Sequence, residues 1–186
     1  MTVTLRPLTV PDLVVVRPWF EDVDTRRFLG GRDWPARMLA LTEAVIGTIF
    51  RGALQTAAYR WIALDCADPV GYIDCGVFDR WTVCGAGRAA DPEVVSVIDR
   101  PAASIALAVD PTRRKAGIGR SMVRAVVDAP EVRHVEVFGA GVEPENVASI
   151  RCFEASGFLR QSDEPDWEGM LYLIRDRERD DHADTP

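Results

Sequence analysis

A basic, glycine-containing segment at residues 113–120 has a composition suited to binding an anion. Its sequence is RRKAGIGR, and it lies between an apolar, strand-like run and a segment with the apolar spacing of a helix. The first turn of a helix presents unpaired N–H groups and a partial positive charge, so a phosphate or pyrophosphate is a natural ligand there. Gly117 and Gly119 would let oxygen atoms approach the backbone because neither carries a Cβ.

The charge of this segment is opposite to that of the whole chain. The formal net charge is −7 over 186 residues, and the single lysine, Lys115, lies in the basic segment. We expect no nucleic-acid partner, because such partners require a basic face. A negative field would attract a cationic partner such as an amine, although acidity also serves solubility alone.

Two known nucleotide-binding loops do not fit the segment. A Walker A loop, G-x-x-x-x-G-K-[ST], is absent. A Rossmann fingerprint needs a third glycine, but Met122 stands at that place after Gly119, and Pro144 stands there after Gly141. The alternative to an anion site is a helix that merely begins with glycines and has a solvated basic end.

Two spaced motifs give the chain a family resemblance. Residues 114–119, R-x-x-G-x-G, follow the apolar run and Asp-Pro of residues 107–111, and they resemble the pyrophosphate loop of the GNAT N-acetyltransferase superfamily. Residues 146–158, NVASIRCFEASGF, resemble its second signature, N-x-x-[AS]-I-x-x-Y-x-x-x-G-F. The clear resemblance covers residues 102–158, and two motifs at this separation are more specific than either one alone.

The resemblance implies a mixed α/β fold with a mostly antiparallel central sheet flanked by helices. It also implies an enzyme that moves an acetyl group from acetyl-CoA to a primary amine, by direct transfer in a ternary complex and without a metal ion. Residues 114–119 would bind the pyrophosphate, and the edge at Leu107 and Val109 would pair with the pantetheine arm. Asn146 would contact that arm, and the main-chain N–H near Ala108 would support the oxyanion. The full set expected to contact acetyl-CoA is Leu107, Ala108, Val109, Arg114, Lys115, Ala116, Gly117, Ile118, Gly119, Arg120, Asn146 and Phe153.

The chain departs from the family pattern at Phe153, where the signature has a tyrosine that protonates the leaving thiolate. Phenylalanine has no proton to give, so we expect water to supply it and Phe153 to pack in the core. Tyr72 and Tyr172 are alternative proton donors, because each places a hydroxyl in a predicted strand.

A general base must remove a proton from the incoming ammonium. Asp74 is the first candidate, because it is a carboxylate within an otherwise apolar strand. Glu143, just before the predicted helix at 146–156, is the second candidate, and Glu136 is the third. The alternatives are a polar strand-edge position for Asp74 and, for Glu143, a charge that complements a helix dipole.

These residues must be positioned by alternating strands and helices. Periodicity and turn residues predict strands at 3–8, 59–64, 70–78, 105–109, 132–138, 158–160 and 169–174. They predict helices that begin near Pro11, and at 35–51, 118–128 and 146–156, with the long excursion 79–100 holding one extra strand. Within 118–128 the side chains expected to face the core are Ile118, Met122, Val123 and Val126. We expect one domain at 1–175 and a disordered tail at 176–186.

Other features bear on location and on metal sites. No apolar run approaches ~18 residues and no basic leader precedes one, so we expect a cytoplasmic protein with no membrane partner. The four cysteines form no C-x-x-C pair, so we expect free thiols and no zinc site. A homodimer is expected only because the resembling family often forms one.

Three functions remain open at this stage. The first is acetylation of a small-molecule amine, such as an aminoglycoside-like or polyamine-like compound. The second is acetylation of a protein N-terminus or lysine. The third is a non-catalytic, CoA-binding regulatory module, an alternative that the phenylalanine at position 153 keeps open.

Overall fold

The computed structural model describes residues 2–85 and 93–177. Its main sheet has the strand order β1-β3-β4-β7-β8-β10-β9, with β2 paired to β3. The strands are β1 (Val3–Pro7), β2 (Ile49–Phe50), β3 (Ala53–Asp65), β4 (Asp68–Phe78), β7 (Ala102–Val109), β8 (Val137–Val142), β9 (Leu159–Arg160) and β10 (Leu171–Asp176). A separate two-stranded sheet contains β5 (Trp81–Cys84) and β6 (Val94–Ile98).

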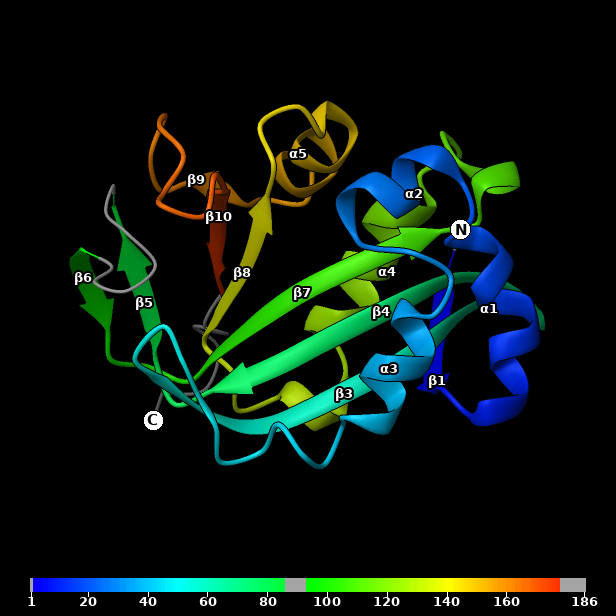
Figure 1. The fold of residues 1–186 in the computed structure, drawn as a ribbon, viewed down its shortest axis with the longest axis horizontal. Helices are drawn as coiled ribbons and strands as arrows, with labels where there is room; N and C mark the ends of the chain where they lie inside the picture. Colours follow the sequence, from blue (N-terminus) through cyan, green and yellow to red (C-terminus); the bar gives the residue numbers. More distant parts are fainter. Residues whose placement is uncertain (1, 86–92, 178–186) are drawn as a thin grey trace, which may run out of the picture.

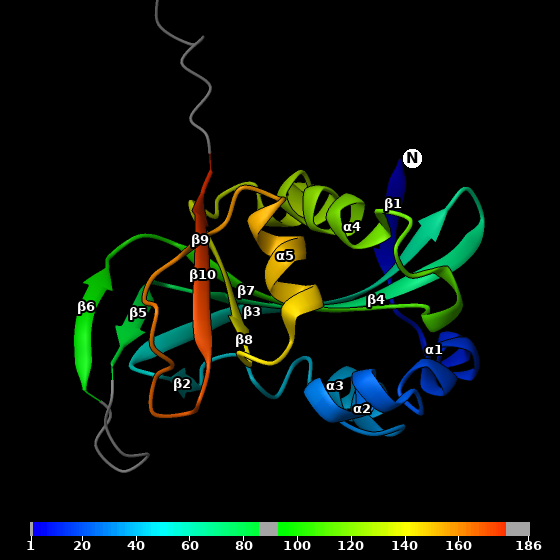
Figure 2. The same ribbon diagram turned by 90° about the horizontal axis from the view of Figure 1, so that it is seen from above.

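The helices cover both faces of the main sheet. They are α1 (Leu13–Trp19), α2 (Val23–Phe28), α3 (Trp34–Ala40), α4 (Ile118–Val127) and α5 (Val147–Glu154). Figures 1 and 2 show α4 and α5 on one face and α1 to α3 on the other. Every strand pair of the main sheet is antiparallel except β7 with β8. The predicted mixed, mostly antiparallel sheet flanked by helices is therefore confirmed.

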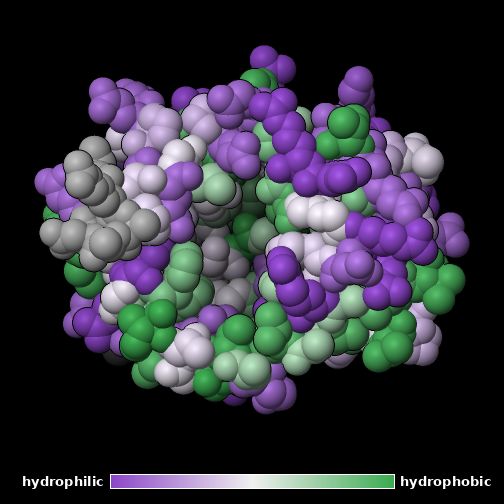
Figure 3. Space-filling view, viewed as in Figure 1, coloured by the Kyte–Doolittle hydropathy of each residue, from purple (hydrophilic) through white to green (hydrophobic). Residues whose placement is uncertain are grey.

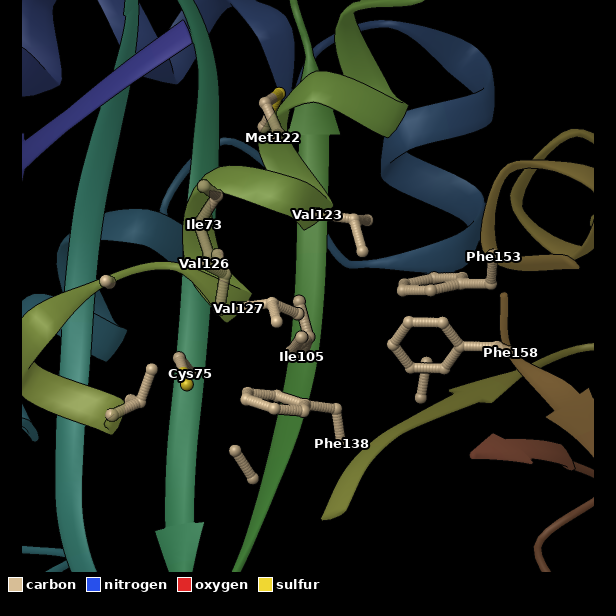
Figure 4. Packing of buried hydrophobic residues seen from close by; sticks show 14 of the residues in the cluster. Ile73, Cys75, Ile105, Met122, Val123, Val126, Val127, Phe138, Phe153 and Phe158 are labelled. Atoms are coloured by element: carbon tan, nitrogen blue, oxygen red, sulfur yellow. The ribbon is translucent and has the colours of Figure 1, made fainter. Parts of the chain in front are cut away.

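The larger core lies between the sheet and the α4–α5 layer. The four side chains predicted to face inward from α4 are at most 2 % exposed. Figure 4 shows three of them, Met122, Val123 and Val126, over β4 and β7, with Phe153 of α5 beside Phe158. Burying each aliphatic side chain of this kind contributes about 1.5–3 kcal/mol. A Cβ at Gly71 would lie 2.4 Å from the Met122 sulfur, so this glycine permits the close approach of α4 to β4.

A second core lies on the opposite face, under α1 and α3. Phe20 and Trp34 stack with ring centroids 5.6 Å apart, and both meet Tyr72 of β4 edge to face. Neighbouring residues of β4, such as Ile73 and Cys75, pack in the α4 core instead. This alternation fixes which side chains of β4 face which layer.

The predicted helix at 35–51 is too long. Helix α3 ends at Ala40, and a series of turns leads to β2. The Thr42 hydroxyl donates to the carbonyls of Met38 and Leu39, and Gly47 has φ 85°. A hydroxyl that bonds the preceding turn and a left-handed glycine both favour ending a helix. These two effects outweigh the helical spacing of apolar residues on which the prediction of a helix at 35–51 was based.

The strand predicted at 132–138 is displaced along the chain. Residues Pro130–Val132 form a 3₁₀ turn, and β8 instead runs through the GAG sequence that was taken to follow the strand. The glycines are extended because they pair with β10. Rings lie over them: a Cβ at Gly139 would lie 2.2 Å from Trp81, and one at Gly141 would lie 2.9 Å from Tyr172.

The excursion at 79–100 contains a hairpin of two strands, β5 and β6, and not one extra strand. Its residues 86–92 lie outside the described part of the chain. The single domain at 1–175 stays a prediction. Strand β10 includes Asp176, and residues 178–186 of the predicted tail are outside the described residues.

Within 2–85 and 93–177, no helix is long and apolar enough to span a membrane. In the same two ranges, no three His, Cys, Asp or Glu side chains gather as metal ligands would.

Candidate active site

The sheet opens between β7 and β8. These parallel strands pair only where Ala102–Ser104 face Val137–Gly139, and beyond that point β7 pairs with β4 alone. Within residues 2–85 and 93–177, the C-terminal half of β7, which includes Leu107 and Val109, therefore has main-chain groups without a strand partner on its β8 side. An extended ligand with amide groups can add to such an edge as a strand does.

The basic loop follows this open edge and begins α4. Lys115 and Gly117 have left-handed backbones, with φ 65° and 78°, and Ile118 is the first helical residue. Left-handed residues at a helix start direct successive N–H groups into one concavity, which is an arrangement that holds anions. The side chains of Lys115, Ala116 and Arg120 are exposed around it.

Gly119 has a further role that its sequence position did not reveal. A Cβ there would lie 2.9 Å from the Cys152 sulfur of α5. The glycine therefore also allows α5 to pack against the start of α4. Burial in this contact raises the pKa of the Cys152 thiol.

The side chain of Arg114 points to α2 and binds protein groups. Its guanidinium donates to the Asp22 carboxylate and to the Thr25 hydroxyl, each at 2.6 Å. Asp22 also caps α2 by accepting the Thr25 N–H. Arg114 thus fastens the loop to α2, and what it can offer an anion is its backbone N–H.

Asp74 lies near the middle of the sheet and pairs with Arg60 of β3. The guanidinium NH1 and the carboxylate Oδ1 are 2.9 Å apart, and the two side chains are 5 % and 14 % exposed for Arg60 and Asp74. Burial raises the pKa of Asp74 to about 6, and the Arg60 charge limits that rise. Asp74 alternates with Ile73, so it lies on the α1–α3 face, together with Tyr72.

The other candidate acids and bases lie on or beside β8 and β4. Glu143 follows β8, and its carbonyl accepts the Asn146 N–H at 2.9 Å. Glu136 is 3.8 Å from Arg100 at the start of β8, the end away from the opening. The Tyr72 hydroxyl is fully buried and, within the described residues, has no hydrogen-bond partner.

Phe153 and Asn146 both belong to α5. The Phe153 ring is 3 % exposed and packs on Phe158 with centroids 5.1 Å apart, as expected of a core residue. The Asn146 side-chain oxygen accepts the Ser149 N–H at 3.2 Å and so caps the helix. Its predicted contact with the pantetheine arm stays a prediction.

A hollow opens on the α1–α3 face of the sheet (Figure 3). Comparison with Figure 1 places it over β7, between α2 and α3 on one side and β5, β6, β8 and β10 on the other. The β4 side chains that alternate toward this face include Asp74.

A buried charge cluster ties together two segments beside this face. Arg51, in the turn between β2 and β3, pairs with Asp166 and Glu168 of the β9–β10 connection. It also donates to the Tyr172 hydroxyl, and its guanidinium lies 4.3 Å from the centre of that ring. The side chains of Arg51 and Asp166 are 7 % and 3 % exposed. Tyr172 is therefore engaged by protein groups, and burial raises its pKa.

Sequence reasoning missed Arg60 and Arg51. For Arg60 a signal was present, because Arg60 and Asp74 are equally distant from Ala67 in the turn of the predicted hairpin. No comparable signal existed for Arg51, whose partners are more than a hundred residues away.

The opened parallel pair and the glycine loop agree with the comparison of the chain with known families. Residues 19–158 match the Acetyltransferase (GNAT) family. The chain belongs to this family. It is therefore an acetyl-CoA-dependent N-acetyltransferase, with acetyl-CoA as the acyl donor.

Relatives and solved structures agree with this assignment. The chain is 28 % identical over 164 residues to the uncharacterized N-acetyltransferase YfmK of Bacillus subtilis (strain 168), covering 88 % of this chain and 90 % of the relative. It is 26 % identical to an aminoglycoside N(6')-acetyltransferase type 1 of Klebsiella pneumoniae, covering 95 % and 84 %. The structure of aminoglycoside acetyltransferase AAC(6')-Ib in complex with coenzyme A superposes with a TM-score of 0.68 at 23 % identity, covering 95 % of each chain. At that identity the likeness shows the shared fold.

Proposed function

We propose that this GNAT enzyme acetylates a primary amine on a small, cationic molecule, by direct transfer in a ternary complex. The observation that carries the proposal is the buried carboxylate of Asp74 on the hollowed face, one strand away from the open edge of β7. Its pKa of about 6 suits a group that must be ionised at neutral pH and still accept a proton.

The open edge and the loop fit acetyl-CoA. The left-handed loop would hold the pyrophosphate on the N–H groups of 114–119, with Lys115 and Arg120 adding exposed positive charge. Leu107 and Val109 would pair with the amide-containing arm along the unpaired edge, and Asn146 would contact that arm. Acetyl-CoA supplies the thioester that carries the acetyl group.

The residues of the chain then have separate tasks. Asp74 accepts the proton of the acceptor ammonium, directly or through a water molecule, so that the amine can attack. The N–H near Ala108 donates to the carbonyl oxygen as negative charge develops there. Phe153 offers no proton, so the leaving thiolate receives one from solvent. Glu143 is the second candidate for the base.

The acceptor class follows from charge and shape. The cluster of one arginine with Asp166 and Glu168 has a net negative charge, and the carboxylate of Asp74 on this face is balanced by Arg60. An amine-rich acceptor such as an aminoglycoside matches that charge, and relatives that are named aminoglycoside acetyltransferases match over 95 % of this chain. A hollow bounded on two sides favours a compact acceptor over the main chain of a protein (Figure 3).

The proposal is tested by thiol release from acetyl-CoA with kanamycin, spermidine and an N-terminal peptide as acceptors. Calorimetric titration of acetyl-CoA into the enzyme runs in parallel. We expect turnover with kanamycin and spermidine. We expect Asp74→Asn to lower kcat at least about tenfold. Turnover with the peptide alone would support a protein acetyltransferase. Tight binding with no turnover on any acceptor would support a CoA-binding module.

A further inference from the structure

Arg60 is the deeper partner of the pair with Asp74. It is 5 % exposed, and its NH1 group also donates to the Tyr59 carbonyl at 3.1 Å. Its Nε is buried and, within the described residues, has no hydrogen-bond partner. An arginine placed so deeply is costly unless a carboxylate compensates it, and the carboxylate it meets is the proposed base.

The ion pair engages the carboxylate of Asp74 from the β3 side. Its 2.9 Å contact joins NH1 of Arg60 and Oδ1 of Asp74. The side chain of Asp74 is the more exposed of the two, at 14 %. The carboxylate is therefore held from the β3 side and keeps some exposed surface on the α1–α3 face.

No second charged group shares this role among the described residues. Within the described residues, the charge that opposes the effect of burial on the pKa of Asp74 is that of Arg60. On β4, Tyr72 presents a neutral phenol on the same face, and Cys75 lies on the opposite one. On β7 the residue paired with Asp74 is Ala106, and on β3 the next polar group along this face is the neutral Gln55.

We propose that Arg60 is a positioning residue that keeps Asp74 ionised and holds its carboxylate in place to accept the proton of the acceptor amine. This inference rests on the proposed role of Asp74 as the base. Burial and Arg60 act on the carboxylate in opposite directions: burial favours the protonated acid, and the guanidinium favours the carboxylate. Without the guanidinium, Asp74 would be protonated at neutral pH and unable to accept a proton.

The test compares pH profiles of kcat/KM for the wild type, Arg60→Met, Arg60→Lys and Asp74→Asn. Kanamycin and acetyl-CoA serve as substrates from pH 5.5 to 9.5, so the titration of the acceptor amines is common to all variants. We expect the acid limb of Arg60→Met to move up by about one to three pH units. A shift of about two units would lower activity about tenfold at pH 7 and restore it near pH 9. Arg60→Lys keeps the charge and should move the limb by less.

The control variant is Arg100→Met, which removes a surface arginine paired with Asp176 and Glu136, away from the hollow. Its pH profile should match the wild type. If Arg60→Met loses activity by the same factor at every pH, Arg60 is merely structural and the inference is wrong. If Asp74→Asn retains wild-type activity and profile, the proposed base is wrong, and the two failures are thereby distinguished.

A second variant and a direct measurement guard against misfolding. Arg60→Gln removes the charge but keeps a hydrogen-bond donor, and circular dichroism and thermal unfolding report whether each variant folds. Carboxyl ¹³C NMR titration of the folded variants, with Asp74 assigned from the spectrum of Asp74→Asn, gives the pKa directly. A higher pKa in Arg60→Gln than in the wild type supports the inference, and an unchanged pKa overturns it.

Discussion

Gly139 of β8 should be intolerant of any side chain. An alanine Cβ there would lie 2.2, 2.5 and 2.6 Å from three ring carbons of Trp81. Carbon atoms in contact prefer about 3.5–4.0 Å, so the ring would have to retreat by more than about 1 Å. Trp81 cannot yield easily, because it is 7 % exposed and its ring nitrogen donates to Gln161 at 3.0 Å.

Gly139→Ala should lower the free energy of unfolding. Overpacking a closely fitted site costs about 1–3 kcal/mol. For a domain of this size, each kcal/mol lowers Tm by about 2–4 °C, so Tm should fall by about 2–12 °C. The change should also lower kcat/KM, because Gly139 is the last β8 residue paired with β7 before the opening.

Gly141→Ala is the matched control on the same strand and the same face. Its Cβ would lie 2.9–3.1 Å from the Tyr172 ring, a smaller overlap, so its cost should be clearly lower. The free energies of unfolding come from urea titration, with thermal melts beside them. A Gly139→Ala variant as stable as Gly141→Ala would refute the reasoning that ring packing selects the glycine.

Three further predictions follow from buried or constrained groups. Arg51→Met leaves Asp166 buried without its partner and should lower the free energy of unfolding, measured by urea titration, by about 3 kcal/mol. A second change, Asp166→Asn, should restore part of that loss. Gly117→Ala imposes a side chain on a backbone with φ 78° in the anion loop, whereas the guanidinium that Arg114→Ala removes binds α2. In calorimetry, Gly117→Ala should therefore weaken acetyl-CoA binding more than Arg114→Ala does. A larger loss of affinity for Arg114→Ala would contradict binding of the pyrophosphate by backbone N–H groups. The hydrogen bond from Arg6 is the chief cause that lowers the pKa of Asp12 in the folded protein. The ionised carboxylate therefore stabilises the fold above the usual pKa of an aspartate, and this stabilisation is lost as the pH falls toward the lowered pKa. Asp12→Asn should therefore flatten the loss of unfolding free energy below pH 4, and an unchanged slope would argue against this pair.

The sequence alone was sufficient where the determining interactions are local. The strand, loop and helix around Arg114–Gly119 were predicted from neighbouring residues, and α4 buries the side chains that its periodicity predicted. Helical periodicity and glycine positions act over a few residues, so they can be read without knowledge of the fold. The two motifs also sufficed to indicate the family.

Tertiary structure decided the features that depend on distant segments. Residues 139–141 belong to β8 because they pair with β10, and rings from β5 and β10 lie over the two glycines. The Arg51 cluster joins residues that are 115 and 121 positions apart. Arg114 and Gly119 also make contacts with α2 and α5 that the local sequence pattern does not describe. Asp74 could be singled out from the sequence by its residue type. Its burial and its pairing with Arg60 arise only when β3, β4 and β7 assemble. Desolvation and ion pairing depend on the whole environment of a group, which only the tertiary structure provides.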